Sequence, residues 1–298
     1  MSTKQNGYAV RTLVSPLTLS RTRGKAVYWT VFGTVVVAFA LAFLFPVYWM
    51  ATGALKTPDE ITRTPPTLVP DQWHISAYTD AWDLMQLPQH LWNTVVQAAG
   101  AWLLQIVLCT AAAYALSKLR PAFGKVILGG ILATLMVPAQ ALVVPKYLTV
   151  ADLPLIHTSL LNDPLAIWLP AVANAFNLYL LKRFFDQIPS DVLEAAELDG
   201  AGRLRTLWSV VLPMSRPVLG VVSIFALVAV WQDFLWPLMV FSDPDKQPIS
   251  VALVQLSQNI QLTVLIAAMV IASIPMVAMF LVFQRHIIAG ISAGSTKG

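Results

Sequence analysis

The sequence is short of charge and of cysteine. Only 11% of its 298 residues are charged, whereas soluble domains carry about 25%. With 57% hydrophobic residues, the chain could not cover itself with polar surface in water. The one cysteine, Cys109, excludes a disulfide framework, and we interpret it as a small packing residue. An integral membrane protein meets these limits, because lipid is its solvent.

Signatures of catalysis are missing as well. No G-x-x-x-x-G-K-[ST] occurs, so the chain lacks the phosphate cradle of a P-loop. GAGRLR at Gly200 begins like a dinucleotide fingerprint, but Arg205 stands where the third glycine belongs and no strand precedes it. The four histidines lack metal-ligand spacing, and no nucleophile motif appears. We therefore expect no enzyme activity, metal or cofactor on this chain, and a partner that supplies energy for any transport.

Long apolar segments are abundant instead. Six uncharged segments approach the roughly 20 residues that a membrane-spanning helix needs, and none alternates strictly as barrel strands do. Since only helices and closed barrels cross membranes, the sequence predicts an all-α integral membrane protein with six transmembrane helices. The segments are Ala26–Ala51, Leu91–Leu116, Val126–Pro145, Pro164–Leu181, Val218–Gln232 with a less apolar extension to Phe241, and Leu262–Phe283.

The placement of positive charge predicts the orientation. Starting from an inside N-terminus, fifteen of the 19 lysines and arginines fall on one side, and Lys56, Arg63, Lys146 and Lys246 on the other. Because cytoplasmic loops carry excess Lys and Arg, we expect both termini in the cytoplasm and the protein in the cytoplasmic (inner) membrane. The net charge of +4 then reflects topology, not nucleic-acid binding. We expect a cytoplasmic N-terminal segment at 1–25, a membrane domain at 26–288 and a cytoplasmic tail at 289–298.

An amphipathic segment, about residues 186–216, interrupts the apolar runs on the predicted cytoplasmic side. Asp191 followed by Glu194 has the capping-box spacing, so we expect Asp191 to cap a short helix. Gly200 and Gly202 permit the backbone to turn, which predicts a helix–bend–helix. The second helix has an apolar stripe of Leu204, Leu207, Trp208 and Val211 and is expected to end at Pro213.

The same segment resembles a known family pattern. EAAELDG from Glu194, followed nine residues later by VVLP, is similar to the E-A-A, three residues, G, nine residues, I-x-L-P pattern of permease subunits of binding-protein-dependent ABC importers. Val210 replaces the isoleucine. Five further stretches resemble the MalG-type permeases of sugar importers: GALKTPDEI, WNTVV, AAAYALSKLR, VPAQALVVPKY and WQDFLWPLMVF. The ending QRHIIAGISAGSTKG is also similar, although Ser295 and Thr296 replace the usual Ala-Val.

The resemblance implies the type I ABC importer permease fold and ATP-driven uptake of a sugar or oligosaccharide by alternating access. The implied partners are a homologous MalF-type permease, two ABC ATPase subunits that bind ATP and Mg, and an extracytoplasmic solute-binding protein. In this family the E-A-A loop is the coupling helix that docks on an ATPase. Carried over, the docking residues are Glu194, Ala195, Ala196 and Gly200, braced by Leu204, Leu207 and Trp208 before Pro213, with Gly290, Gly294 and Lys297 of the tail near the ATPases.

A translocation path is harder to predict. Sugars are held by aromatic faces and polar side chains, which makes Trp231, Gln232, Asp233 and Asn259 the candidates. Asp233 could instead mark the membrane–water boundary, and in this branch the partner subunit can hold the substrate alone. A self-contained channel or ion-coupled secondary transporter is the alternative function, but it leaves the 186–216 segment unexplained. A membrane enzyme or scaffold is disfavoured by the missing catalytic residues.

Overall fold

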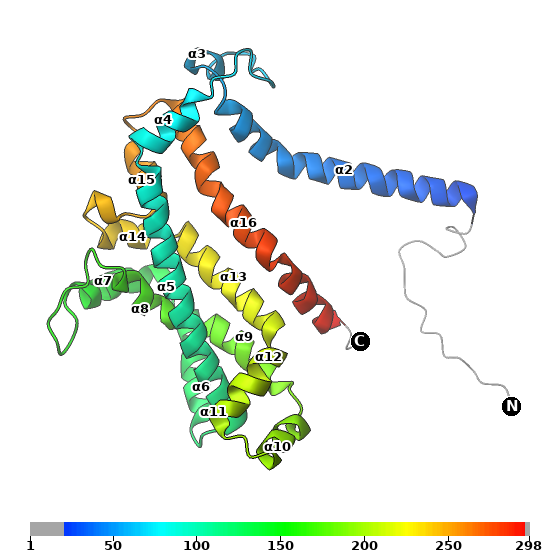
Figure 1. Ribbon diagram of the computed structural model, residues 1–298, viewed down its shortest axis with the longest axis vertical. Coiled ribbons are helices and arrows are strands. Elements are labelled where there is room, and N and C mark those ends of the chain that lie inside the picture. Colours follow the sequence, from blue (N-terminus) through cyan, green and yellow to red (C-terminus); the bar gives the residue numbers. More distant parts are fainter. Residues whose placement is uncertain (1–20, 296–298) are drawn as a thin grey trace.

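The computed structural model describes residues 21–295, with side chains through Gln284. All of the assigned elements in this range are helices, as the sequence predicts. Figure 1 shows α3 (Pro58–Ile61) and α4 (Ser76–Leu84) at one end of the long axis, and α10 (Ser190–Leu198) and α11 (Arg203–Thr206) at the other. These are called the α3–α4 end and the α10–α11 end below.

Among the described residues, three helices are long and apolar enough to cross a membrane unbroken. They are α2 (Thr22–Gly53), α5 (Leu87–Tyr114) extended by the π-helical turn η1 (Ala115–Leu119), and α16 (Leu262–Ser295) over Leu262–Gln284. The first, second and sixth predicted segments therefore coincide with continuous helices.

The third predicted segment, Val126–Pro145, is not one straight helix. It comprises α6 (Gly124–Ala133), η2 (Thr134–Met136), η3 (Ala139–Leu142) and the start of α7 (Val143–Ala151), and its two halves meet at 101°. The break falls at Val137, whose ψ of 122° is extended. The cause is Pro138, because a proline ring disfavours helical backbone in the residue before it.

The fourth and fifth predicted segments are broken too. α8 (Leu165–Val172) and α9 (Ala175–Asp186) meet at 46°, and the Asn174 side chain accepts a hydrogen bond from the Asn177 backbone N at 2.9 Å, which caps α9. α13 (Arg216–Gln232) is followed after Asp233 by α14 (Leu235–Val240), η5 (Pro244–Lys246) and α15 (Ile249–Leu256).

The number of spans reaches six if each of three bent pairs counts as one. One such pair joins 203–214 to α13 at 83°. We assign the fifth span to α13 alone, because the 203–214 stretch begins with two arginines and lies across the end of α13. The 17 residues of α13 extend about 25 Å at the usual helical rise, close to the thickness of the hydrocarbon.

Helix α5 is the centre of the bundle, in contact with α8, α9 and α13. Its approach to α8 requires Gly100, because a Cβ there would lie 2.0 Å from Trp168 Cε2. Trp168 Nε1 donates a hydrogen bond to the Val96 carbonyl at 3.2 Å across the same contact. The two helices are thus held at a distance that any larger residue at position 100 would increase.

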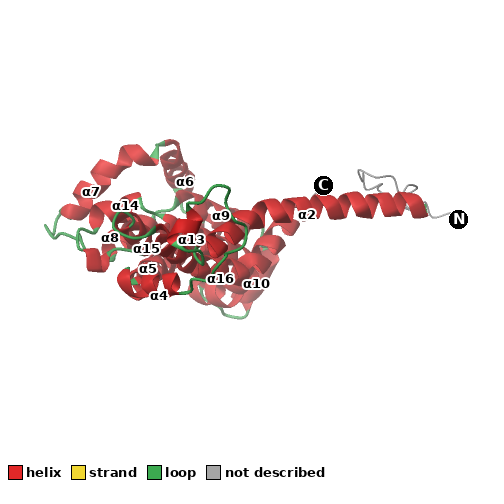
Figure 2. Ribbon diagram, turned by 90° about the horizontal axis from the view of Figure 1, so that it is seen from above, coloured by secondary structure: helices red, strands yellow, loops and turns green. Residues whose placement is uncertain are grey.

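Helix α2 stands apart from the bundle, as Figures 1 and 2 both show. Gly53 is its only buried residue, and the side chain of Ile266 on α16 lies beside it. Large apolar side chains such as Phe39 and Phe43 are exposed along the rest of the helix. This surface suits lipid or another apolar protein surface.

Candidate functional site

The helix–bend–helix segment spans residues 190–214 at the α10–α11 end. Its bend is a Schellman motif: the Gly200 N donates to the Glu197 carbonyl at 3.0 Å, and the Ala201 N to the Ala196 carbonyl at 2.9 Å. Gly200 has φ +78°, a conformation that only glycine adopts without steric cost. Gly202 has an ordinary φ of −68°. The bend therefore depends on the first glycine.

The start of α10 corrects one expectation. Asp191 is not the N-cap, because the helix already begins at Ser190, with Pro189 in the cap position at ψ 141°. No side chain caps the helix, so the capping box is not formed. Asp191 lies within the first turn, where its carboxylate faces the positive end of the helix dipole.

The exposed face of α10 presents the family motif. None of its residues is buried, and Glu194 and Ala195 are exposed while Ala196 is half-buried. Leu198 on the same helix is 89% exposed, so its side chain is accessible for contact. The face is open to another molecule.

The second half of the segment comprises α11, the π-helical turn η4 (Leu207–Val211) and α12 (Leu212–Met214), so the helix continues one residue past Pro213. Leu207 and Val211 are buried in a cluster formed with α5, α9 and α13. Leu204 is 74% exposed and Trp208 69% exposed, so they do not brace the segment within this chain. Both line an open apolar groove beside α5, of about 520 Å³.

Polar contacts join the segment and the residues just before it to the end of α5 and to η1. Tyr114 Oη donates to the Arg203 carbonyl at 3.2 Å, and Lys118 Nζ donates to the Ile188 carbonyl at 2.9 Å. Ser117 Oγ donates to Asp186 Oδ1 at 2.8 Å, just before the segment. The residues on either side of α10 are therefore joined to the α5–η1 end by three hydrogen bonds and a buried apolar cluster.

A polar cavity of about 150 Å³ lies inside the bundle, between α5, α7, α8, α13 and α14. Asp233 lines it, as does Gln105, whose Nε2 donates to the Ala171 carbonyl at 3.0 Å. The other candidates for a translocation path lie elsewhere: Trp231 is buried, and Gln232 and Asn259 are exposed. The structure thus brings only one of the four predicted residues to this cavity.

Sequence reasoning missed Lys146, which it placed in an outer loop. The lysine belongs to α7, and the bend at Pro138 turns this helix so that Lys146 lines the cavity. Its Nζ lies 3.7 Å from the ring centroid of Trp236 on α14. The signal in the sequence is a lysine directly after a Pro-broken apolar run.

Comparison with known proteins identifies the family. Residues 86–292 match the family described as binding-protein-dependent transport system inner membrane component. The chain belongs to that family. It is thus a permease, an inner-membrane component of a transporter.

Relatives of the permease have sugar-related names. It is 29% identical over 267 residues to the diacetylchitobiose uptake system permease protein NgcG of Streptomyces coelicolor, covering 88% of this chain and 87% of the relative. It is 31% identical over 259 residues to the sulfoquinovosyl glycerol transport system permease protein SmoH of Agrobacterium fabrum, covering 86% and 89%.

A solved structure has the same fold. It is a chain from the crystal structure of a bacterial ABC transporter involved in the import of the acidic polysaccharide alginate. The TM-score is 0.78 at 24% identity, with 89% of this chain and 98% of that chain covered. The likeness supports the importer permease fold.

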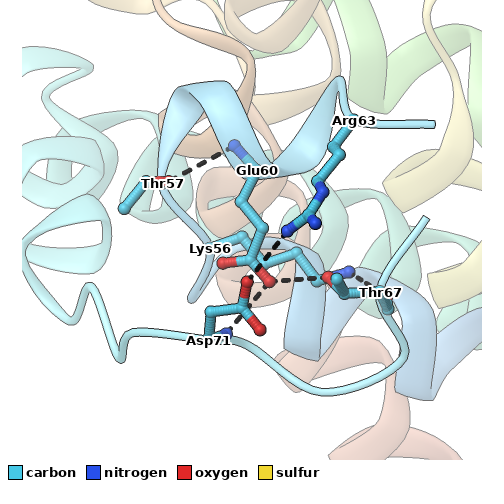
Figure 3. A network of polar contacts seen from close by, with 6 residues as sticks. All are labelled: Lys56, Thr57, Glu60, Arg63, Thr67 and Asp71. Carbon is cyan, nitrogen blue, oxygen red and sulfur yellow. Dashed lines mark hydrogen bonds and ion pairs between the residues drawn. The ribbon is translucent and has the colours of Figure 1, made fainter. Parts of the chain in front are cut away.

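The α3–α4 end of the permease contains a buried polar network, shown in Figure 3. Lys56 is 1% exposed; its Nζ donates to the Thr67 carbonyl and lies 4.5 Å from the ring centroid of Trp49. Glu60 Oε1 accepts from Thr67 Oγ1 at 2.6 Å and from the Asp71 N at 3.0 Å. The bond from Thr67 does most to lower the pKa of Glu60 below its ordinary value.

The predicted C-terminal contacts lie at the limit of the described chain. Gly290 and Gly294 fall within α16, and Lys297 lies outside the described residues. Within residues 21–284, where side chains are described, no cluster of His, Cys, Asp or Glu could hold a metal ion.

Proposed function

We propose that this permease is one of two transmembrane subunits of an ATP-driven ABC importer for a sugar or oligosaccharide. An extracytoplasmic solute-binding protein delivers the solute, which crosses by alternating access. ATP and Mg bind to two partner ATPase subunits and not to this chain. The names of the relatives support the sugar class, because diacetylchitobiose and sulfoquinovosyl glycerol both contain sugar rings.

The 190–214 segment is the observation that carries the proposal. Its first helix is exposed, its bend is fixed by Gly200, and its second helix is anchored on α5, α9 and α13. Such an element can receive a displacement on one side and pass it to spanning helices on the other. Glu194, Ala195, Ala196 and Gly200 form the ATPase-docking surface in this proposal, with Gly290, Gly294 and Lys297 near it.

The membrane topology follows from charge. The segment and both termini lie in the cytoplasm, because most lysines and arginines then face inward. The partner permease, of the MalF type, covers apolar surface that this chain leaves open. Two such surfaces are helix α2, with Gly53 as its only buried residue, and the groove at Leu204 and Trp208.

Charge reversal on α10 tests the docking. In a tagged permease, Glu194→Lys is expected to leave membrane insertion unchanged but to lower both co-purification of the ATPase subunits and uptake of labelled diacetylchitobiose. Asp83→Lys is the matched control, since Asp83 is equally an exposed carboxylate on a short helix, at the opposite end. Normal co-purification of the ATPases with Glu194→Lys would contradict the docking role.

Reconstitution separates this proposal from a self-contained channel or ion-coupled carrier. Liposomes that contain only this permease should not accumulate sugar, with or without an ion gradient. Uptake should require the partner permease, the ATPases, ATP and the binding protein together. Transport by the chain alone would refute the proposal.

A further inference from the structure

The cavity beside Asp233 combines an ionisable pair of side chains with two helix breaks, a combination that side-chain packing alone does not require. A lysine and an aspartate, both half-buried, line the same small space, which is partly open and lies between the helices. Ionisable side chains among spanning helices are costly, and they mark ligand or ion pathways more often than not. Two helix breaks, at Ala173–Asn174 and at Asp233–Phe234, border the same space. Irregular backbone at membrane depth is tolerated where it lines such a cavity.

The lysine has unused hydrogen-bonding capacity. Among the residues that the structure describes, none accepts a hydrogen bond from Lys146 Nζ, whose close contact is the Trp236 ring. An ammonium group has three donors. The ring contact holds the group in place without using a directional acceptor, so its protons remain available to a ligand in the cavity.

The aspartate is held by one hydrogen bond to its backbone and one to its side chain. Ser250 Oγ donates to the Asp233 carbonyl at 2.7 Å, and the Trp236 N donates to Asp233 Oδ1 at 3.4 Å. A carboxylate has about four acceptor sites, so acceptor sites remain for a ligand. Trp236 is itself fixed, because its Nε1 donates to the Ala166 carbonyl at 3.0 Å.

We propose that Lys146 and Asp233 line the substrate path of this subunit and bind an uncharged, hydroxyl-rich solute. The inference deepens the proposed importer function and rests on it. A hydroxyl group can accept from the ammonium and donate to the carboxylate at once, so a sugar satisfies both. The two opposite charges leave the cavity neutral, which favours an uncharged solute over an anion. This subunit, and not only its partner, thereby contacts the solute.

Thiol accessibility in the complete transporter tests the path without knowledge of the substrate. Lys146→Cys, Asp233→Cys and Val144→Cys are each made in a Cys109→Ser background and assembled with the partner permease, the ATPases and the binding protein. Val144 is the matched control on α7, 62% exposed and outside the cavity. Each variant is reacted with a cationic and an anionic water-soluble methanethiosulfonate, without nucleotide and in the ATP-trapped state.

We expect the two cavity positions to show opposite preferences. The Asp233→Cys thiol, left beside Lys146, should react about tenfold faster with the anionic reagent, and Lys146→Cys about tenfold faster with the cationic one. Both rates should change with the nucleotide state, and Val144→Cys should show neither effect. Rates at 146 and 233 that are independent of nucleotide, or equal to the control, overturn the assignment.

Uptake tests the solute class. Diacetylchitobiose is the uncharged probe and sulfoquinovosyl glycerol the sulfonated one. The inference is supported if the transporter takes up diacetylchitobiose and if Lys146→Met and Asp233→Asn each reduce this uptake at least tenfold. Each variant removes one of the two charged groups that bind the solute and leaves the other in place. Uptake of the sulfonated probe alone, or uptake of diacetylchitobiose unchanged in both variants, overturns it. Co-purification of the ATPases from the same preparations tells a failure of this inference from a failure of the importer function.

Discussion

The two ends of the molecule hold their chain in different ways. At the α3–α4 end, buried Lys56 and Glu60 tie a loop together through side-chain hydrogen bonds, and the polar face of α5 binds the loop before α15. At the α10–α11 end, α10 has no buried residue, and only the following helix is anchored. The α3–α4 end is thus held by buried side chains, whereas the first helix of the α10–α11 end is left exposed, as the proposed docking role requires.

The contrast shows that burial, and not the sequence motif alone, determines what a charged stretch does. GALKTPDEI and EAAELDG are both charged stretches beside apolar runs, yet the first buries two of its three charged side chains, Lys56 and Glu60, whereas the second exposes all of its charged side chains. Burial of the charged side chains distinguishes a stretch that stabilises the fold from a stretch that is available to a partner. The predictions below test that separation at each end.

Gly200→Ala should have the largest effect. Position 200 has φ +78°, where a side chain is strained even though space is open, so the bend should loosen and coupled uptake should fall at least tenfold. Gly202→Ala is the control, because position 202 has an ordinary φ and equally open space. Equal uptake by the two variants, measured with labelled solute in cells, would show that the bend does not matter.

Leu207→Ala should destabilise the α10–α11 end. Its side chain is buried between α5, α9 and α13, and loss of a buried leucine commonly costs about 2–5 kcal/mol. Leu198→Ala should leave thermal stability unchanged, because that side chain is exposed, but should weaken co-purification of the ATPases. The comparison fails if Leu198→Ala lowers the melting temperature of the purified transporter as much as Leu207→Ala does.

Glu60→Gln should loosen the α3–α4 end by a smaller amount. Hydrogen exchange of residues 57–71 should rise several-fold, whereas Asp59→Asn, at an exposed neighbouring carboxylate, should change little. Because folding lowers the pKa of Glu60, its stabilisation is complete above the ordinary value of 4.5 and disappears as pH falls through the lowered value. A ratio of exchange rates between Glu60→Gln and the unsubstituted protein that stays constant as the pH falls below 4.5 would contradict the role of the carboxylate.

Arg63→Ala should have the smallest effect. Arg63 Nη1 and Asp71 Oδ2 lie 3.3 Å apart, but both side chains are 60% exposed. Exposed pairs of this kind contribute at most about 1 kcal/mol. The melting temperature should hardly move, at low or high salt. A large, salt-dependent drop in the melting temperature would instead show that this ion pair stabilises the α3–α4 end.

The sequence predicts the helices better than their breaks. Length and apolar composition are sufficient for α2, α5 and α16, because a continuous span leaves a continuous signal. Pro138 lies within an equally apolar run, so hydropathy alone does not reveal the break. The backbone preference of a residue before proline does predict the break at Val137. Asp191 failed as a cap because α10 begins at Ser190 after Pro189, one residue earlier than a cap at Asp191 would allow.

The cavity was beyond sequence reasoning for another reason. Lys146 and Asp233 are far apart in the chain, and they line one space only because α7 turns at Pro138 and α13 stops at Gln232. Likewise, periodicity gave Leu204 and Trp208 the same face as Leu207, but which residues of a stripe are covered depends on the neighbouring helices.

Helix α2 has a consequence for how such a protein is made. In a newly synthesised copy, α2 is a long apolar helix that makes few contacts with the rest of the chain. Its packing is therefore incomplete until other subunits or lipid cover it. We expect an orphan copy to be recognised by membrane proteases and to be short-lived. Balanced synthesis with its companions would then determine how much of it accumulates in the cell.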